Sequence, residues 1–303
     1  MVRIASDNPP GFKDRETVRC VNRDERQPDK LPTALLVFNP HPYRVLFDPE
    51  YKPLLTNYER ELMVSELGVD YLLEYPFSAE FAAMSCEQFC HKLVNELMAR
   101  VIVVGEGYRF GHNRAGTVGT LQQMTKRVGA QVHVVSPHMV GHCCMSNNVA
   151  GVSSQKCHIS DGNINKTSTS TIRTLLAANQ LPEANNLLGY PFFVMGEAVL
   201  SEQHECDNSV TKIELYPPED KFLPADGIYT TCTIIDGSTY NSVTNIGQRP
   251  KLDDKGVMRF IETYLHDYDG RELCGKLVCV EFLQLYGKMG LHKSGSCNVK
   301  QKH

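Results

Sequence analysis

An apolar strand that runs directly into a glycine-rich turn constrains the fold of this chain most. Residues 101–104 read Val-Ile-Val-Val, and the turn Gly-Glu-Gly-Tyr-Arg-Phe-Gly follows at once, from Gly105 to Gly111. A continuous apolar strand is typical of a parallel sheet that is covered on both faces. Glycine lets a backbone approach a ligand closely because it has no side chain. The segment therefore predicts an α/β sheet. Gly105 and Gly111 are either ordinary turn glycines, which is the simpler interpretation, or part of a phosphate-handling turn.

A second apolar run, residues 33–38, ends in the same way. Phe38, Asn39, Pro40 and His41 stand where it passes into a loop. Ligands on parallel sheets bind at the carboxyl ends of the strands. A rigid, solvated loop is the simpler interpretation of these four residues, and a lining of the binding site is the functional one.

Helices are predicted between the strands. Capping-box spacings begin at Thr56 and Ser85, and each precedes a run with helical apolar spacing. Further strands are predicted over residues 69–75 and 131–135. Strands that alternate with helices form right-handed βαβ units and therefore a parallel sheet.

A cluster of hydroxyl side chains with an arginine begins a later helix. Ser168, Thr169 and Ser170 precede Arg173 in the sequence Ser-Thr-Ser-Thr-Ile-Arg. A helix N-terminus presents free N–H groups to anions, and a guanidinium matches phosphate oxygens. A helix cap beside a surface arginine explains the same residues without a ligand. The cluster predicts nucleotide binding only together with the parallel sheet.

The second half of the chain has a different pattern. Short β-rich runs lie between turn residues, over 192–200, 210–215, 227–235, 241–246, 257–265 and 276–285. This spacing predicts a small antiparallel barrel. We accordingly expect a divergent or poorly ordered lead-in over residues 1–30, an α/β domain over 31–189, a barrel over 190–286 and a tail over 287–303.

Composition excludes several classes of protein. The net charge of −4 offers no electrostatic attraction to nucleic acid or to an anionic membrane, and no apolar run is long enough to span a bilayer. Eleven scattered cysteines, without a signal-peptide pattern before them, indicate a reducing, cytoplasmic setting. Residues 142–166 predict a flexible insertion, whose Cys and His spacing matches no standard zinc module. Composition does not predict the oligomeric state.

Several short motifs in order resemble the prokaryotic-type bifunctional FAD synthetases, in which an FMN adenylyltransferase domain precedes a riboflavin kinase barrel. The resemblance covers residues 31–282, and its motifs are 38–42, 68–70, 76–77, 105–111, 168–173, 187–189, 223–229, 245–250 and 261–263. It implies a Rossmann-like nucleotidyltransferase domain, followed by the barrel. It further implies riboflavin, FMN and ATP as substrates, with Mg²⁺ as cofactor.

The resemblance also implies roles for individual residues. Glu262 would accept the proton of the riboflavin 5′-hydroxyl, while Thr211 would contact the nucleotide and Mg²⁺. The α/β domain would bind ATP with the following residues: Gly105, Gly111, Ser168, Thr169, Ser170 and Arg173. The flavin would contact Phe38, Asn39, Pro40 and His41.

Four stretches depart from the family motifs, namely residues 5–14, Gly107, 208–212 and 286–289. They leave an alternative open. In that alternative, the chain is a catalytically degenerate paralogue that binds flavin or adenine nucleotide without turnover.

Overall fold

The computed structural model describes residues 2–4, 18–20, 31–136, 168–200, 210–250, 256–268 and 273–287. Two compact units emerge from it. The first comprises Met1–Met139 with Asp220–Phe222, and the second comprises Val140–Glu219 with Leu223–His303. The predicted insertion over 142–166 lies outside the described residues, as does the tail after Gly287.

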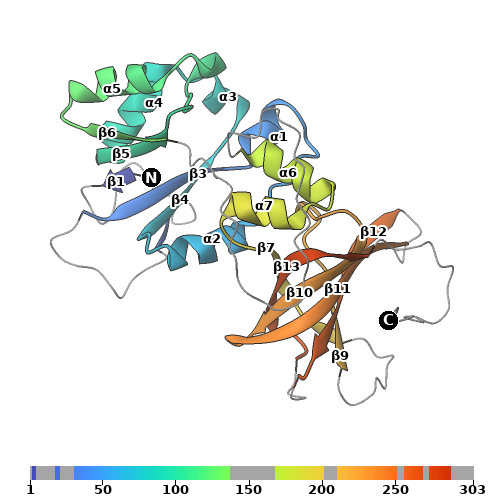
Figure 1. Cartoon of the computed structure of the whole chain (residues 1–303). Helices are drawn as coiled ribbons and strands as arrows, with labels where there is room; N and C mark the ends of the chain where they lie inside the picture. The colour runs from blue at the N-terminus through green and yellow to red at the C-terminus, as the bar shows by residue number, and fades with distance from the viewer. Residues whose placement is uncertain are drawn as a thin grey trace. The chain divides into compact units, whose positions relative to one another are not determined.

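The first unit is a six-stranded sheet with helices (Figure 1). Its strands are β1 (Val2–Ile4), β2 (Val18–Cys20), β3 (Thr33–Asn39), β4 (Tyr71–Pro76), β5 (Ala99–Gly105) and β6 (Gln131–Val135), in the order β2-β4-β3-β1-β5-β6. Its helical elements are α1 (Pro42–Leu46), α2 (Asn57–Glu66), α3 (Ala79–Ala82), α4 (Cys86–His91), a π-helical turn η1 (Lys92–Glu96), a 3₁₀ turn η2 (His112–Arg114) and α5 (Val118–Lys126).

Local sequence signals explain where these helices begin. At Thr56 the capping box is complete, because its hydroxyl accepts from Glu59 N–H and Glu59 Oε2 accepts from Thr56 N–H at 2.7 Å. The box at Ser85 is complete as well. Both predicted helix starts are confirmed, and the second helix changes to π-helical geometry over Lys92–Glu96. Gly68, with φ +69°, follows the end of α2.

The sheet buries apolar side chains on both faces. Leu35 and Val37 pack with Val64 of α2, whereas Leu36 and Phe38 pack on the other face with a core that contains Phe89. Successive strand residues point to opposite faces, so a strand covered on both sides must be apolar throughout. This explains the continuous apolar runs in the sequence.

The predicted parallel pairing is confirmed. β3 pairs with β4 and β5 with β6, both in parallel, and β1 is antiparallel to both β3 and β5. Residues 1–30, expected to be a lead-in, contribute β1 and β2 to the sheet. Three residues are too short to show a period of two in the sequence.

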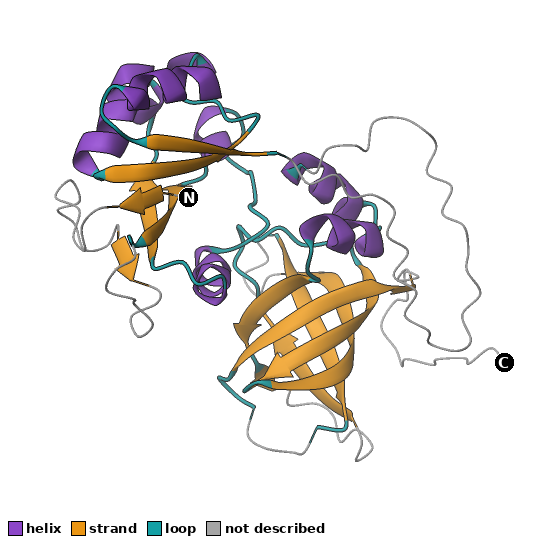
Figure 2. Cartoon of the chain, turned by 60° about the vertical axis from the view of Figure 1, so that its left-hand side comes forward, coloured by secondary structure: helices purple, strands orange, loops and turns teal. Residues whose placement is uncertain are grey.

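The second unit contains an antiparallel barrel (Figure 2). Helices α6 (Thr169–Ala177) and α7 (Leu181–Leu188) precede β7 (Phe192–Glu197), β8 (Val199–Leu200), β9 (Val210–Leu215), β10 (Gly227–Ile235), β11 (Ser238–Pro250), β12 (Val257–His266) and β13 (Leu277–Gly287). The strand order is β7-β13-β10-β11-β12-β9-β8. The two edge strands, β7 and β8, are consecutive in the chain and meet at the buried Ala198, so the sheet curls round on itself.

Hydroxyl groups fill part of the barrel interior. Thr231 lies 2.8 Å from Ser242 and 2.7 Å from Thr244, whose hydroxyl in turn lies 3.0 Å from that of Thr263. Each of these side chains is buried and hydrogen-bonded, which offsets the cost of burying a polar group. Because side chains alternate along a strand, the residues between these buried ones point out of the barrel.

Helices α6 and α7 belong to the barrel unit in the structure, although the sequence predicts a domain boundary at residue 189. Asn185 of α7 donates to the Phe282 carbonyl at 2.8 Å and accepts from Phe192 N–H at 2.8 Å, so it fixes α7 on β13 and β7. Where the functional domains divide stays a prediction. No helix among the described residues is long and apolar enough to cross a membrane.

A buried ion pair holds Asp220–Phe222 in the first unit. Lys221 Nζ lies 2.6 Å from Glu59 Oε2 and 2.5 Å from the Leu54 carbonyl, and neither charged side chain is more than 1% exposed. Each charge therefore offsets the cost of removing the other from water.

We expect Lys221→Met to destabilise the first unit by about 3–5 kcal/mol, because it leaves Glu59 charged and buried. Lys221→Met combined with Glu59→Gln should recover most of this loss, since glutamine keeps an acceptor for Thr56 N–H. The matched control is Lys92→Met, which breaks the more exposed Lys92–Glu96 pair and should cost less than about 1 kcal/mol. Hydrogen exchange of the α2 amides measures these changes. Equal exchange rates in Lys221→Met and Lys92→Met would contradict the prediction.

A buried thiol adds a pH dependence. Burial, with smaller contributions from Cys86 and Glu87, raises the pKa of Cys90 from 9.0 to about 11. The folded state favours the neutral thiol, so this contribution to stability is complete below pH 9.0 and is lost as the pH rises toward about 11. Chemical unfolding between these pH values should show a steeper decline for the wild type than for Cys90→Ala. Parallel declines would show that this thiol carries no such linkage.

Candidate functional site

The parallel strands of the first unit end along one edge of the sheet. Because β1 is antiparallel to both β3 and β5, these two strands run in the same direction. The carboxyl ends of β3 and β5, Asn39 and Gly105, therefore lie on the same edge, as the sequence predicts. This edge is the candidate nucleotide site of the first unit.

The four predicted flavin contacts divide into two kinds. Asn39, Pro40 and His41 are exposed at this edge. Phe38 instead belongs to an aromatic cluster, with ring centroids 5.4 Å from Phe77 and 5.3 Å from Phe81. Phe38 thus packs the core, and only the loop after it faces solvent.

His41 has a structural role at the start of α1. Its Nδ1 accepts from Tyr43 N–H at 3.1 Å, and its ring stacks on Tyr51 with centroids 4.7 Å apart. The neighbouring Tyr43 ring lies 5.0 Å from Tyr51. These rings form an aromatic group beside the end of β3, in which His41 and Tyr43 are exposed and Tyr51 is partly buried.

The two candidate glycines differ in what surrounds them. A Cβ at Gly111 would lie 2.7 Å from Cys86 Sγ, and Gly111 has φ +72°. A Cβ at Gly105 would meet only the Val135 carbonyl, at 4.0 Å. Gly111 is therefore required by packing against α4, whereas Gly105 has room beside it for a ligand.

The hydroxyl cluster begins α6, in the second unit. Ser168 caps the helix, because its hydroxyl accepts from Thr171 N–H at 3.1 Å. Thr169 and Ser170 are exposed in the first turn, and Arg173 is half-buried one turn further on. The capping interpretation of Ser168 is confirmed, and the nucleotide contacts of this cluster stay a prediction.

Glu262 lies in a group of charged side chains on the barrel. Its Oε1 is 3.0 Å from Lys212 Nζ, and its Oε2 accepts from Asn245 Nδ2 at 3.4 Å. Lys212 Nζ is also 3.6 Å from Glu214 Oε1, and Glu214 Oε2 is 3.2 Å from Arg249. We call Lys212, Glu214, Arg249 and Glu262 the Glu262 cluster.

Polar neighbours complete this cluster. Tyr216 donates to Glu214 Oε2 at 2.7 Å and contacts the Arg249 guanidinium. The Oδ1 atom of Asn245 is buried and has no hydrogen-bond partner among the described residues. An acceptor of this kind, beside the predicted catalytic carboxylate, can receive a hydrogen bond from a bound ligand.

Neighbouring charges in the cluster shift the pKa values of Lys212 and Glu214. Burial alone would lower the pKa of Lys212, but the hydrogen bond and charge of Glu262, with Tyr264 and Glu214, raise it above its usual value. For Glu214, burial opposes ionisation, yet Tyr216, Arg249 and Lys212 together lower its pKa. Lys212 and Glu214 therefore stabilise each other's charged form.

Thr211 does not face Glu262. Side chains alternate along a strand, and Lys212 and Glu214 share the face of Glu262, which pairs directly with Glu214 across β9 and β12. Thr211 lies on the opposite face of β9. The two residues from which the sequence predicts a kinase site are thus separated by the sheet.

Lys212, Glu214 and Arg249 were not among the predicted site residues. The sequence Val-Thr-Lys-Ile-Glu-Leu over residues 210–215 alternates charged and apolar side chains after Thr211, and this alternation is the signal that identifies the outward face. Arg249 lies on another strand, and only the pairing of β11 with β12 brings it near.

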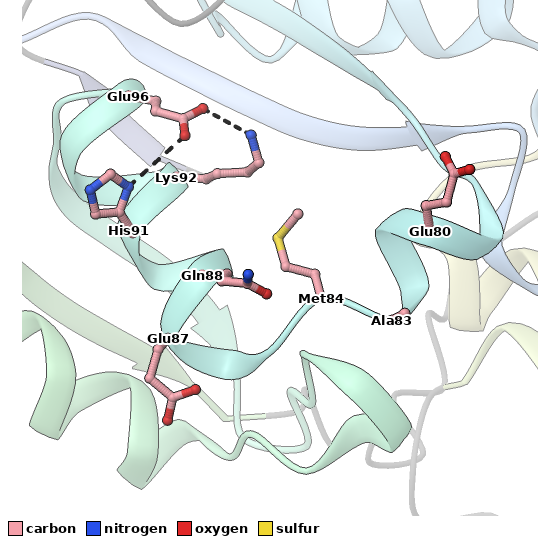
Figure 3. A pocket seen from close by; sticks show the side chains of 8 residues that line it. All are labelled: Glu80, Ala83, Met84, Glu87, Gln88, His91, Lys92 and Glu96. Carbon is pink, nitrogen blue, oxygen red and sulfur yellow. Dashed lines mark hydrogen bonds and ion pairs between the residues drawn. The ribbon is translucent and has the colours of Figure 1, made fainter.

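An open cavity of about 610 Å³ lies on the first unit, along α3, α4 and η1 (Figure 3). Figure 3 shows His91 and Lys92 turned toward Glu96. His91 Nδ1 lies 3.9 Å from Glu96 Oε1, and Lys92 Nζ lies 3.0 Å from Glu96 Oε2. The remaining lining residues are Glu80, Ala83, Met84, Glu87 and Gln88. None of the predicted site residues lines this cavity.

Comparison with known proteins identifies a domain in each half of the chain. A family model described as FAD synthetase matches residues 19–149, and one described as riboflavin kinase matches residues 188–289. The curated relative from Bacillus subtilis (strain 168), a bifunctional riboflavin kinase/FMN adenylyltransferase, is 27% identical over 83% of this chain and 73% of its own length. The chain therefore contains a FAD synthetase domain followed by a riboflavin kinase domain, and it is similar to the bifunctional riboflavin kinase/FMN adenylyltransferases.

Further relatives are similar to this chain over a comparable length. The relative from Haemophilus influenzae is 26% identical over 83% of this chain and 74% of its own length. That from Escherichia coli (strain K12) is 26% identical, over 81% and 71%. Both carry the same description as the Bacillus protein.

A solved structure has the same fold. The crystal structure of a macrolide-efflux protein from Streptococcus pneumoniae superposes with a TM-score of 0.67 and 23% identity, and covers 87% of this chain and 78% of that one. At this identity the likeness establishes the fold alone.

The two glycines should respond differently to substitution. Gly111→Ala should destabilise the first unit by about 1–3 kcal/mol, because of its left-handed backbone and the contact with Cys86. Gly105→Ala should change stability by less than about 0.5 kcal/mol but weaken ATP binding about tenfold. Thermal unfolding and titration calorimetry measure the two effects. A Gly105→Ala protein with unchanged ATP affinity would remove Gly105 from the nucleotide site.

Proposed function

We propose that this chain makes FMN and FAD. It phosphorylates riboflavin with ATP to give FMN, and it transfers an adenylyl group from a second ATP to FMN to give FAD. The observation that carries this proposal is the match of the FAD synthetase model to the parallel sheet and of the riboflavin kinase model to the barrel, in one chain. The alternative of binding without turnover is not favoured, because both enzyme families match.

In the kinase reaction, the 5′-hydroxyl oxygen of riboflavin attacks the γ-phosphorus of ATP. The new O–P bond forms as the bond between the γ-phosphorus and the bridging oxygen breaks, and ADP leaves. Glu262 accepts the hydroxyl proton, which requires an ionised carboxylate within hydrogen-bond reach. Asn245 and Lys212 hold this carboxylate by its two oxygens.

In the adenylyl transfer, a phosphate oxygen of FMN attacks the α-phosphorus of ATP and pyrophosphate leaves. The chain contributes alignment and charge stabilisation, not a covalent intermediate. Gly105 offers its backbone at the sheet edge, and the loop Asn39–His41 with its aromatic neighbours offers a surface for the flavin. Thr169, Ser170 and Arg173 are proposed to bind phosphate.

Mg²⁺ is proposed as the partner of ATP and not as an ion that the barrel itself holds. Thr211 does not face Glu262, and the carboxylates of Glu262 and Glu214 are engaged by Lys212 and Arg249. In the described part of the chain, no three His, Cys, Asp or Glu side chains are grouped to hold a metal. Magnesium commonly keeps its waters and binds through substrate phosphates. We expect the reaction in the cytoplasm, in agreement with the scattered cysteines.

Replacing the proposed base should separate the two reactions. Glu262→Gln should lower riboflavin phosphorylation about 10²–10⁴-fold, because the amide cannot accept the proton, and leave FMN adenylylation unchanged. Chromatography of flavins after incubation with Mg²⁺ and ATP measures both steps. The control is Glu281→Gln on β13, which β10 and β11 separate from β12. Full kinase activity in Glu262→Gln would remove Glu262 from the mechanism.

A further inference from the structure

Two carboxylates of the Glu262 cluster stand directly opposite each other. Glu214 on β9 and Glu262 on β12 are cross-strand partners, with side chains on the same face. Like charges in this position destabilise a sheet. Their side chains are only 11% and 19% exposed, so water screens the repulsion poorly. Such a pair requires a cation between its members.

Lys212 supplies that cation. Its Nζ lies 3.0 Å from Glu262 Oε1 and 3.6 Å from Glu214 Oε1, and the side chain is 13% exposed. Lys212 reaches this place because it precedes Glu214 by two residues on the same strand and therefore shares its face. Arg249 contacts the other oxygen of Glu214, at 3.2 Å, and leaves the space between the carboxylates to Lys212.

A divalent ion would use the same oxygens. Mg²⁺ and Mn²⁺ prefer carboxylate oxygens, and one or two carboxylates are a common protein contribution to such a site. An ammonium group placed between two carboxylates excludes a metal ion both by charge and by occupying the space. It also fixes the direction of the Glu262 carboxylate.

We propose that Lys212 takes the place of a divalent ion between Glu214 and Glu262, and that it is a positioning residue for Glu262. The positioning role of Lys212 rests on the proposed kinase function, but the exclusion of metal by Lys212 does not. The barrel then receives Mg²⁺ only with the nucleotide.

Binding of Mn²⁺ alone tests the exclusion directly. We compare the full-length wild type, Lys212→Met and Lys212→Arg without nucleotide, with free Mn²⁺ measured by electron paramagnetic resonance. Lys212→Met should gain one site that binds Mn²⁺ at least about tenfold more tightly than the wild type does, and Lys212→Arg should not. Adding Glu214→Gln to Lys212→Met should abolish the new site. Equal Mn²⁺ binding by Lys212→Met and the wild type would overturn the proposal.

A second variant decides the question if Lys212→Met does not fold. Glu214→Gln in the wild-type background removes one of the facing charges and keeps the shape of the side chain. Because Lys212 excludes the metal in our proposal, this variant should bind Mn²⁺ no less than the wild type does. A loss of Mn²⁺ affinity in Glu214→Gln would show that the carboxylates hold a metal in the native protein, and would overturn the proposal.

Kinetics separate this inference from the proposed function. At saturating Mg-ATP, extra free Mg²⁺ should leave riboflavin phosphorylation unchanged in the wild type and activate it in Lys212→Met. Activation of the wild type by free Mg²⁺ through the same carboxylates, lost in Glu214→Gln, would contradict the proposal. If the wild type phosphorylates no riboflavin but Lys212→Met gains the Mn²⁺ site, the proposed function is contradicted, while the exclusion of metal by Lys212 still holds.

Discussion

The antiparallel register of β9 and β12 determines what surrounds the proposed catalytic carboxylate. In this register Glu214 faces Glu262, and Lys212 lies on the same face. A slip by one residue would turn every side chain of β9 to the other face and bring Thr211, Ile213 and Leu215 to the face of Glu262. The apolar residues Ile213 and Leu215, both fully buried, prevent such a slip because it would expose them. The barrel core therefore dictates that Lys212, and not Thr211, shares the face of Glu262.

In the first unit, the direction of the strands determines where the candidate site lies. Four parallel strands end at one edge, and the core packs against both faces of the sheet, so the loops after β3 and β5 are left at the surface. The two glycines of the turn after β5 have separate roles. Gly111 is required by its close packing against Cys86, whereas Gly105 leaves room for a ligand to approach. The aromatic rings around His41 add a surface of the kind that planar ligands contact.

Structural features that depend on a few neighbouring residues could be predicted from the sequence, and those that depend on distant segments could not. Thr56 and Ser85 satisfy their own helix ends within three residues, so both helix starts were predictable. The parallel pairing and the barrel follow from strand patterns, but the closure of the barrel at Ala198 does not. Lys221 and Glu59 are 162 residues apart, and nothing near either of them predicts the pair. Thr211 was a reasonable candidate for the kinase site by its position in the sequence, but the alternation of residues 211–215 places it on the face of Ile213 and Leu215. Which of these residues stand opposite Glu262 depends on a register that the sequence leaves undetermined.

We propose that one chain carries out two successive transfers from ATP to a flavin, with the barrel performing the first. Both transfers can be followed by incubating riboflavin with the wild-type protein, Mg²⁺ and ATP radiolabelled at either the γ- or the α-phosphate. We expect the γ-label to appear in FMN, and the α-label to appear in the flavin only as FAD, after FMN has formed. Riboflavin that binds to the protein but acquires neither label would contradict this proposal.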